Sequence, residues 1–231
     1  MKCDRFNKWT GPSLFKEARR YFQPGTGGPQ HRRGVEFLQL AAQKGHVLAE
    51  TWLGAAYDYG IGVMRNRRRA FQHYLNAAKS GNPGAMYHIG VFYYEGTGVR
   101  RSLRLAVKWL REASRLGDLD AAHLLGVCYR YGRGVRPNRQ RGFRLELQAA
   151  TGGVVEAQFS VGVCLSKGQG VSADPKEAFK WYLAAARRGH DDAAHNVAYM
   201  YECGRGVRKN GKKARFWYRR AEAYRRRQPP A

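Results

Sequence analysis

Arginine recurs at every third position in the segment CYRYGRGVRPNRQ, which runs from Cys128 to Gln140. Guanidinium groups bind carboxylates and phosphates through paired hydrogen bonds, so such a run could hold a polyanion. A three-residue period fits neither an amphipathic helix, which repeats every 3.6 residues, nor a strand, which repeats every two. The embedded Gly-Arg-Gly would interrupt either element. A longer sequence period is therefore needed to explain these arginines.

That longer period is 36 residues. The segment LGAAYDYGIGV (53–63) realigns with later segments at 89–99, 125–135, 161–171 and 197–207. Each of the five contains a Gly-x-Gly turn followed by valine, and a second segment with apolar residues at three- and four-residue intervals comes after it. Each repeat is therefore predicted to contain two short amphipathic helices, A and B, joined by this turn.

The start of helix B is marked by capping residues. Positions 66, 102, 138, 174 and 210 are Asn, Ser, Asn, Asp and Asn, and Pro175 stands at an expected first helical position.

A degenerate first copy of the repeat is found by stepping back 36 residues. We expect a basic N-terminal tail at 1–12, a degenerate first repeat at 13–48, repeats at 49–84, 85–120, 121–156, 157–192 and 193–228, and a C-terminal tail at 229–231.

The expected fold class is all-α, an alpha-alpha superhelix or solenoid of about six 36-residue helix-turn-helix repeats. A lone hairpin cannot bury its apolar stripe, so neighbouring hairpins must stack. Small residues at Gly54, Gly90, Gly126, Gly162 and Ala198 would let the helices approach closely. The sequence thus predicts one continuous core and a single solenoid domain.

The repeated pattern A-x-x-x-L-G-x-x-Y-x-x-G-x-G-V, followed by A-x-x-W-Y-x-x-A-A-x-x-G, resembles the Sel1-like repeat family over almost the whole chain. The run from 171 to 190 is closest to it, and the hairpin at 13–48 departs from it. The resemblance implies a tetratricopeptide-like solenoid whose concave face docks protein partners. Some Sel1-like proteins are cysteine-rich and bind β-lactams, with a disulfide across each helix pair. Here Cys128, Cys164 and Cys203 all fall in A helices and Cys3 precedes the array, so we expect reduced thiols.

No catalytic signature accompanies the repeats: the sequence has no Ser-His-Asp pattern, paired carboxylates or phosphate-binding loop. His123 and His195 occupy equivalent positions two repeats apart, too distant to share a metal ion. His88 and His123 could approach one another, but no carboxylate or thiolate converges on them. We therefore expect no enzyme activity, no metal site and no cofactor.

A partner groove is predicted on helix A. When Leu53, Gly54 and Tyr57 are turned inward, the opposite side of the helix carries aromatic and polar residues that would anchor a partner. An alternative interpretation is that some of them pack between neighbouring A helices. The predicted groove residues are Trp52, Asp58, Tyr59, Tyr87, His88, Tyr94, His123, Arg130, Tyr131, His195 and Tyr199.

A basic edge is predicted at the turns between helices A and B, where stacking would align the cations of successive repeats. Cations in the first turn of helix B oppose the positive end of the helix dipole, so helix stability does not account for them. The alternative is a solvated loop edge that reflects composition alone. The predicted edge residues are Arg65, Arg67, Arg68, Arg69, Arg100, Arg101, Arg104, Arg136, Arg139, Arg141, Arg208, Lys209, Lys212 and Lys213.

The overall charge indicates the class of partner. With 42 Lys and Arg against 17 Asp and Glu, the net charge of +25 attracts acidic proteins, nucleic acids or anionic membrane surfaces. No apolar run is long enough to span a membrane and no signal peptide is evident, which predicts a soluble intracellular protein. The cytoplasm is favoured, and the mitochondrial matrix is the alternative. We interpret the chain as a non-enzymatic adaptor or scaffold for an acidic protein partner; the alternative is an RNA-contacting structural subunit of a ribonucleoprotein assembly.

Overall fold

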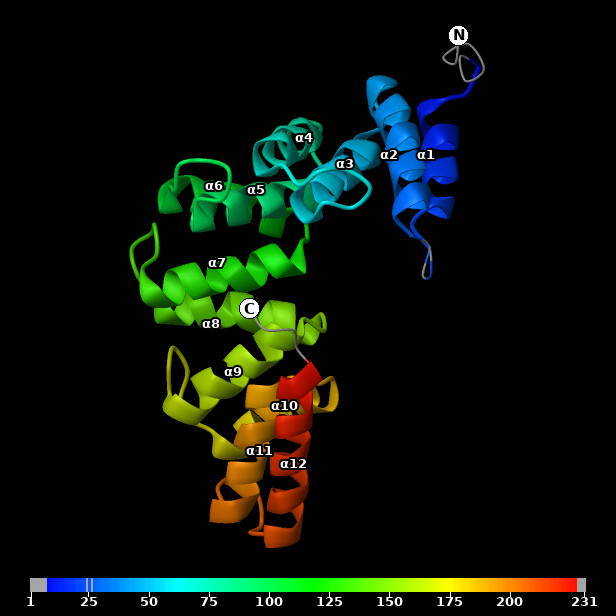
Figure 1. Cartoon of the computed structure of the whole chain (residues 1–231). Helices are drawn as coiled ribbons and strands as arrows, with labels where there is room; N and C mark the ends of the chain where they lie inside the picture. The colour runs from blue at the N-terminus through cyan, green and yellow to red at the C-terminus, as the bar shows by residue number, and fades with distance from the viewer. Residues whose placement is uncertain (1–7, 24, 26, 228–231) are drawn as a thin grey trace. The chain divides into compact units, whose positions relative to one another are not determined.

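The computed structural model describes residues 8–23, 25 and 27–227 (Figure 1). These residues form twelve α-helices and no β-strand, which confirms the predicted all-α class. The helices are α1 (Gly11–Arg20), α2 (Gly28–Gln43), α3 (Val47–Tyr59), α4 (Arg67–Lys79), α5 (Pro83–Glu95), α6 (Leu103–Arg115), α7 (Leu119–Tyr131), α8 (Arg139–Thr151), α9 (Val155–Lys167), α10 (Pro175–Arg187), α11 (Asp191–Cys203) and α12 (Gly211–Arg227).

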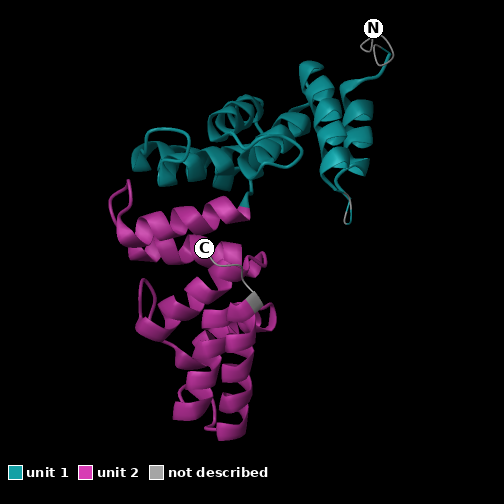
Figure 2. Cartoon of the chain, viewed as in Figure 1, with its two compact units in different colours: residues 1–118 teal, residues 119–231 magenta. Residues whose placement is uncertain are grey.

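The helices belong to two compact units, residues 1–118 with α1 to α6 and residues 119–231 with α7 to α12 (Figure 2). Within each unit, every helix packs on the next one along the chain. The core of the first unit contains one cluster around Leu14, Leu38 and Leu53 and another around Tyr74 and Ile89.

The core of the second unit is a cluster around Val161, Tyr182 and Val197. The single solenoid domain with terminal tails stays a prediction. Residues 11 and 12 of the predicted N-terminal tail already belong to α1, whereas residues 1–7 and 228–231 lie outside the described residues.

Polar side chains start the B helices as predicted. The Oδ1 atom of Asn138 accepts a hydrogen bond from the backbone N–H of Arg141 at 2.8 Å, and Asp174 accepts one from Glu177 at 3.0 Å. Pro175 is the first residue of α10. These bonds satisfy backbone donors that the first helical turn leaves without an intrahelical partner. The same arrangement recurs at Asn66, Ser102 and Asn210.

Glycines in the A helices allow the paired B helix to approach closely, as predicted. A β-carbon on Gly54 of α3 would lie 2.7 Å from ring atoms of Tyr74 in α4, and one on Gly162 of α9 would lie 2.7 Å from the ring of Tyr182 in α10. Both tyrosine rings are buried. The missing side chain thus lets each ring lie directly on the backbone of helix A.

None of the described helices is long and apolar enough to cross a lipid bilayer.

Candidate protein-binding surface

The turns between helices A and B position the basic edge. Gly132 follows α7 in the left-handed region, at φ +71°, where residues with a side chain are strained. Gly170, in the next turn, lies against the start of α8: an added β-carbon would be 2.2 Å from the carbonyl oxygen of Arg139. Gly98 in the first unit is placed in the same way, since an added β-carbon would be 2.9 Å from the carbonyl oxygen of Arg67. Consecutive turns within a unit therefore stack on the start of the preceding B helix.

Two arginines of the basic edge close the end of helix A. The Nε atom of Arg65 donates to the carbonyl oxygen of Asp58 at 2.8 Å, and that of Arg101 donates to the carbonyl oxygen of Tyr94 at 2.9 Å. These carbonyls belong to the last turn of α3 and α5, where backbone acceptors have no intrahelical partner. Arg65 and Arg101 therefore contribute to the fold, which the sequence did not indicate.

Four further edge residues contact side chains of their own repeat. The cationic groups of Arg69, Arg141 and Lys213 lie 5.7, 4.5 and 5.4 Å from the ring centroids of equivalent tyrosines at the ends of the A helices. Such cation–π contacts hold the cation in place while it stays exposed. The Nε atom of Arg67 lies 3.8 Å from Oδ1 of Asp58. The remaining edge residues are exposed and have no ion-pair partner among the described residues: Arg68, Arg100, Arg104, Arg136, Arg139, Arg208, Lys209 and Lys212.

The predicted groove residues differ in exposure. Large aromatic rings are exposed at Trp52 (36%), Tyr59 (66%), Tyr131 (56%) and Tyr199 (47%), and His195 is also exposed. Five others are half-buried, namely Asp58, Tyr87, His88, Tyr94 and His123. In the first unit the residues come from α3 and α5, and in the second from α7 and α11. Their role in binding a partner stays a prediction.

Arg130 does not belong to an exposed groove, which corrects its predicted placement. Its side chain is 6% exposed, and its Nη2 atom lies 2.9 Å from Oε1 of the fully buried Glu146 in α8. The Nη1 atom donates to Sγ of Cys164 in α9 at 3.3 Å. The residue turns inward because a buried carboxylate requires a counter-charge and hydrogen-bond donors.

This cluster of Arg130, Glu146 and Cys164 joins three consecutive helices. The Cys164 thiol donates to Oε2 of Glu146 at 3.5 Å. Burial raises the pKa of the Cys164 thiol to about 12, and the nearby carboxylate adds to this effect. Burial also raises the pKa of Glu146, while the Arg130 charge opposes the rise. Glu146 occupies the position of Tyr74, Leu110, Tyr182 and Tyr218 in other repeats, so its charge was the available sequence signal.

Two of the predicted groove histidines contact tyrosine rings, His88 on the preceding repeat and His195 within its own. His88 stacks on Tyr74 with centroids 4.4 Å apart, and His195 meets Tyr218 edge-on at 5.2 Å. Burial lowers the pKa of His123, whose Nδ1 atom is buried without a hydrogen-bond partner among the described residues. In this described part of the chain, no three His, Cys, Asp or Glu residues are grouped so that they could hold a metal ion.

Comparison with known proteins agrees with this architecture. The family model of the Sel1 repeat matches six times, at residues 14–46, 47–82, 83–118, 119–154, 155–190 and 191–223. Together these matches cover most of the chain and confirm the predicted number of repeats. The chain belongs to the Sel1 repeat family. Repeats of this family generally serve as protein-interaction scaffolds.

Several solved structures are similar to this one. A Sel1 repeat protein from Oxalobacter formigenes is 26% identical, with a TM-score of 0.84 over 96% of this chain and 87% of that one. The protective antigen c5321 from uropathogenic Escherichia coli is 28% identical, with a TM-score of 0.82 over 92% of this chain but 46% of its own. The immunity protein PA5088 from Pseudomonas aeruginosa, 20% identical with a TM-score of 0.63 over 94% of this chain and 82% of its own, shares the fold. No curated protein matches the sequence.

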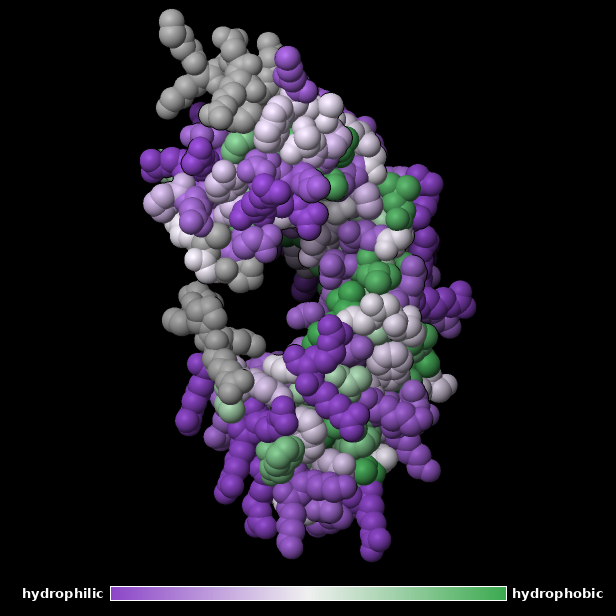
Figure 3. Space-filling model, turned by 90° about the vertical axis from the view of Figure 1, so that its right-hand side faces the viewer, coloured by the Kyte–Doolittle hydropathy of each residue, from purple (hydrophilic) through white to green (hydrophobic). Residues whose placement is uncertain are grey.

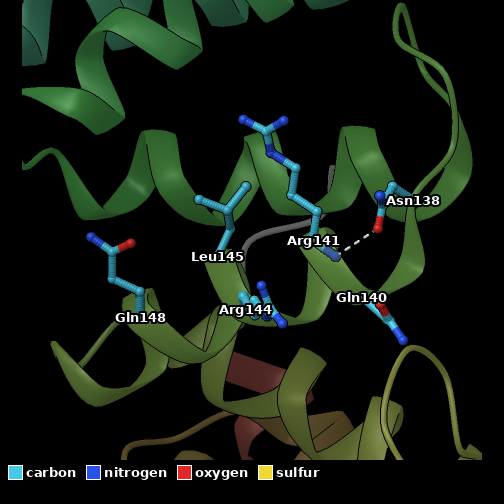
Figure 4. A pocket seen from close by; sticks show the side chains of 6 residues that line it. All are labelled: Asn138, Gln140, Arg141, Arg144, Leu145 and Gln148. Carbon is cyan, nitrogen blue, oxygen red and sulfur yellow. Dashed lines mark hydrogen bonds between the residues drawn. The ribbon is translucent and has the colours of Figure 1, made fainter.

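The fourth repeat of this Sel1 repeat protein has two adjoining hollows beside its basic residues. One, of about 470 Å³, is lined by Asn138, Gln140, Arg141, Arg144, Leu145 and Gln148 (Figure 4). Arg141 and Leu145 extend to the same side of α8 in this view. The other hollow, of about 500 Å³, shares Asn138 and Arg141 and adds Tyr129, Val135, Arg136 and Pro137. Neither lining contains a carboxylate, so both are suited to anionic side chains.

The described cysteines of this Sel1 repeat protein are free thiols. Cys128 and Cys164 are buried, and burial raises the pKa of the Cys128 thiol to about 11. Both thiols are therefore protonated and weakly reactive at neutral pH. Cys203 is exposed, and Cys3 lies outside the described residues.

Proposed function

We propose that this Sel1 repeat protein is a non-enzymatic scaffold that binds an acidic segment of a partner protein. The observation that carries the proposal is the combination of exposed aromatic rings on the A helices with exposed, unpaired cations in the turns that follow these helices. The proposed location is intracellular, with the cytoplasm favoured, in keeping with protonated buried thiols at Cys128 and Cys164.

Tyr131 illustrates how such a surface would work. Its ring is 56% exposed, and the guanidinium carbons of Arg130 and Arg133 lie 4.8 and 5.5 Å from its centroid. A ring held by two cations presents a large contact area with little loss of side-chain entropy on binding. Arg136 and Arg141 line a hollow of the same repeat and would bind carboxylates of the same partner. An acidic segment with an apolar anchor therefore fits this surface.

The exposed cations act mainly on the rate of association. A net charge of +25 attracts an acidic partner over long distances, and surface charge changes the rate of encounter more than the lifetime of the complex. The exposed aromatic rings would instead determine the lifetime, because buried aromatic anchors dominate interface energies. The proposal thus assigns different kinetic effects to the two groups of residues.

The test begins with affinity capture of partners from the source cells, with and without nuclease, followed by binding kinetics with the recovered protein partner. One variant carries Arg68→Gln, Arg104→Gln, Arg136→Gln and Arg139→Gln. The matched control carries Lys79→Gln, Lys108→Gln, Lys180→Gln and Arg187→Gln, which removes equal charge from exposed positions of B helices. A third variant carries Tyr59→Ser, Tyr131→Ser and Tyr199→Ser.

We expect the turn variant to associate at least several-fold more slowly than the control at low salt. The tyrosine variant should instead dissociate faster. Equal association rates for the turn variant and its control would show that only net charge matters and would overturn the role of the basic edge. Unchanged dissociation of the tyrosine variant would overturn the aromatic anchors.

The second candidate function is an RNA-contacting structural subunit of a ribonucleoprotein assembly. It is favoured by the recurrence of exposed arginine at the equivalent positions 100, 136 and 208. Loss of all captured partners after nuclease treatment would favour this function over the scaffold. Partners that survive nuclease and bind as purified proteins would favour the scaffold.

A further inference from the structure

Helix α12 has a solvent-facing side with its own composition. Ala214, Trp217 and Ala221 recur at three- and four-residue spacing and are buried in the core of the second unit. Another side of the helix carries a shallow hollow of about 360 Å³, which is lined by Lys212, Arg215, Phe216, Arg219, Arg220 and Ala223. In Figure 3, whose lower part shows the second unit, long hydrophilic side chains project around a small hydrophobic patch.

The hollow is strongly cationic. Four of its six lining residues are Lys or Arg, and none is acidic. Lys212, Arg215 and Arg219 are exposed and have no ion-pair partner in the described part of the chain. The acidic residue of α12, Glu222, is not part of the lining. Arg225, which also lies outside the lining, forms ion pairs with Asp191 and Asp192 at N–O distances of 3.3 and 3.7 Å. These carboxylates therefore leave the cations of the hollow uncompensated.

Phe216 is an apolar residue at a position that is polar in the other repeats. The equivalent residues are Gln72, Lys108, Arg144 and Lys180. Its ring is 52% exposed, so its burial does not explain why a phenyl group stands there. An aromatic ring flanked by cations at an exposed position is a combination that occurs on surfaces for single-stranded nucleic acid.

Neighbouring side chains hold the Phe216 ring in place. Trp217 meets it edge-on, with centroids 5.5 Å apart and planes at 86°. The guanidinium carbon of Arg220 lies 5.7 Å from its centroid, and Nε of Arg220 donates to the Tyr224 hydroxyl at 2.9 Å. The ring is therefore oriented before any ligand binds, which lowers the entropic cost of a stacking contact.

We propose that this face of α12 binds single-stranded nucleic acid, with the cations contacting phosphates and a base stacking on Phe216. Surfaces for single strands combine a cationic track with aromatic rings on which bases stack. A base-paired duplex would engage the cations but offer no free base to the ring. A lipid bilayer requires a broad apolar helix face, and this hollow has one ring and one methyl group. The inference goes beyond the scaffold function and can fail while that function stands.

The test measures fluorescence anisotropy of a 5′-labelled 12-nucleotide oligouridine RNA with the full chain. A charge variant carries Lys212→Gln, Arg215→Gln and Arg219→Gln; its control carries Lys79→Gln, Lys108→Gln and Arg187→Gln at exposed positions of other B helices. Phe216→Ala, Phe216→Leu and Phe216→Tyr test stacking. Circular dichroism verifies that each variant is folded, as expected for substitutions at exposed side chains.

We expect the α12 charge variant to flatten the slope of log affinity against log salt by about 2, since each phosphate contact contributes about 0.7 for a single strand. The control should change the slope by much less. Phe216→Ala should weaken binding about 5- to 150-fold, the range for loss of one stacked base, with the slope unchanged. Phe216→Leu should also bind the RNA weakly, whereas Phe216→Tyr should bind it like wild type.

Four results would overturn the proposal. The first is an equal effect of the control and α12 charge variants, and the second is wild-type binding by Phe216→Leu. The third is a loss of poly-glutamate binding by Phe216→Ala that equals its loss of RNA binding. This result would indicate that the ligand of the hollow is an acidic polypeptide. The fourth is stronger, Phe216-dependent binding to a duplex or to phosphatidylserine vesicles. Equal binding of oligodeoxythymidine would support the proposal for single strands of both kinds.

Discussion

Replacing Arg130 with methionine removes the counter-charge of Glu146 while a long apolar side chain still occupies the site. In the native protein the Nη2 and Oε1 atoms lie 2.9 Å apart, and the carboxylate is fully buried. Two charges whose centres are about 4 Å apart attract by about 4 kcal/mol at an effective dielectric constant of about 20. Removing one partner of a buried pair typically costs about 3–5 kcal/mol. We expect a loss of this size in the free energy of unfolding, a large fraction of the roughly 5–15 kcal/mol that stabilises most domains.

The double variant Arg130→Met with Glu146→Leu distinguishes the effect of leaving a charge unpaired from the effect of changed side-chain packing. Leu110 occupies the position equivalent to Glu146 in the preceding repeat, so leucine suits this kind of site. Replacing both charges with apolar groups leaves no unpaired charge, and such replacements are often neutral or stabilising. We expect the double variant to recover most of the stability lost by Arg130→Met. Arg139→Met, at an exposed position of the same repeat, serves as the control and should change stability by less than about 0.5 kcal/mol.

The stability deficit of Arg130→Met should change with pH in a defined direction. Burial raises the pKa of Glu146 above its ordinary value, so ionisation of this carboxyl costs stability as the pH rises through the raised pKa. Loss of Arg130 removes the charge that opposes this rise, and the pKa increases further. The stability deficit of Arg130→Met should therefore be smaller at pH 5 than at pH 8.

Urea unfolding followed by far-ultraviolet circular dichroism measures these differences. The reasoning would be refuted by an Arg130→Met protein that is as stable as wild type at pH 8. It would also be refuted by a double variant that is no more stable than the single one, because the loss would then not arise from an unpaired carboxylate.

Three further predictions concern backbone and thiols. Gly132→Val should lower stability by about 1–3 kcal/mol, because φ of +71° strains a β-branched residue; a wild-type melting temperature would contradict this. Gly126→Ala should destabilise by about 1–3 kcal/mol in urea unfolding, since its β-carbon would lie 2.7 Å from Cγ of Glu146, whereas Gly84→Ala in α5, 3.5 Å from Oδ1 of Asn82, should be neutral or stabilising. Equal effects of these two alanines would argue against the close helix contact. Reductant should leave the melting temperature unchanged, because the described cysteines are free thiols; a drop of many degrees would indicate a disulfide.

The sequence alone predicted features that depend on neighbouring residues in the chain. The helix-turn-helix repeats, the capping role of Asn138 and Asp174 and the turn glycine at Gly132 were all predicted correctly. Capping bonds join residues three apart, and the backbone requirement at Gly132 arises within its own turn. The 36-residue period repeats these local signals in register, which made the number of repeats readable.

Tertiary structure alone decided which charged residues are available for binding. Arg130 resembles the exposed arginines around it in sequence, but Glu146 and Cys164, sixteen and thirty-four residues away, bring it into the core. Arg65 and Arg101 lie in the predicted edge, yet their guanidinium groups reach back seven residues to carbonyls at the end of helix A. A long flexible side chain can satisfy its donors in solvent, on a backbone carbonyl or on a buried carboxylate. The choice depends on acceptors that folding brings near it, and spacing along the chain does not specify them.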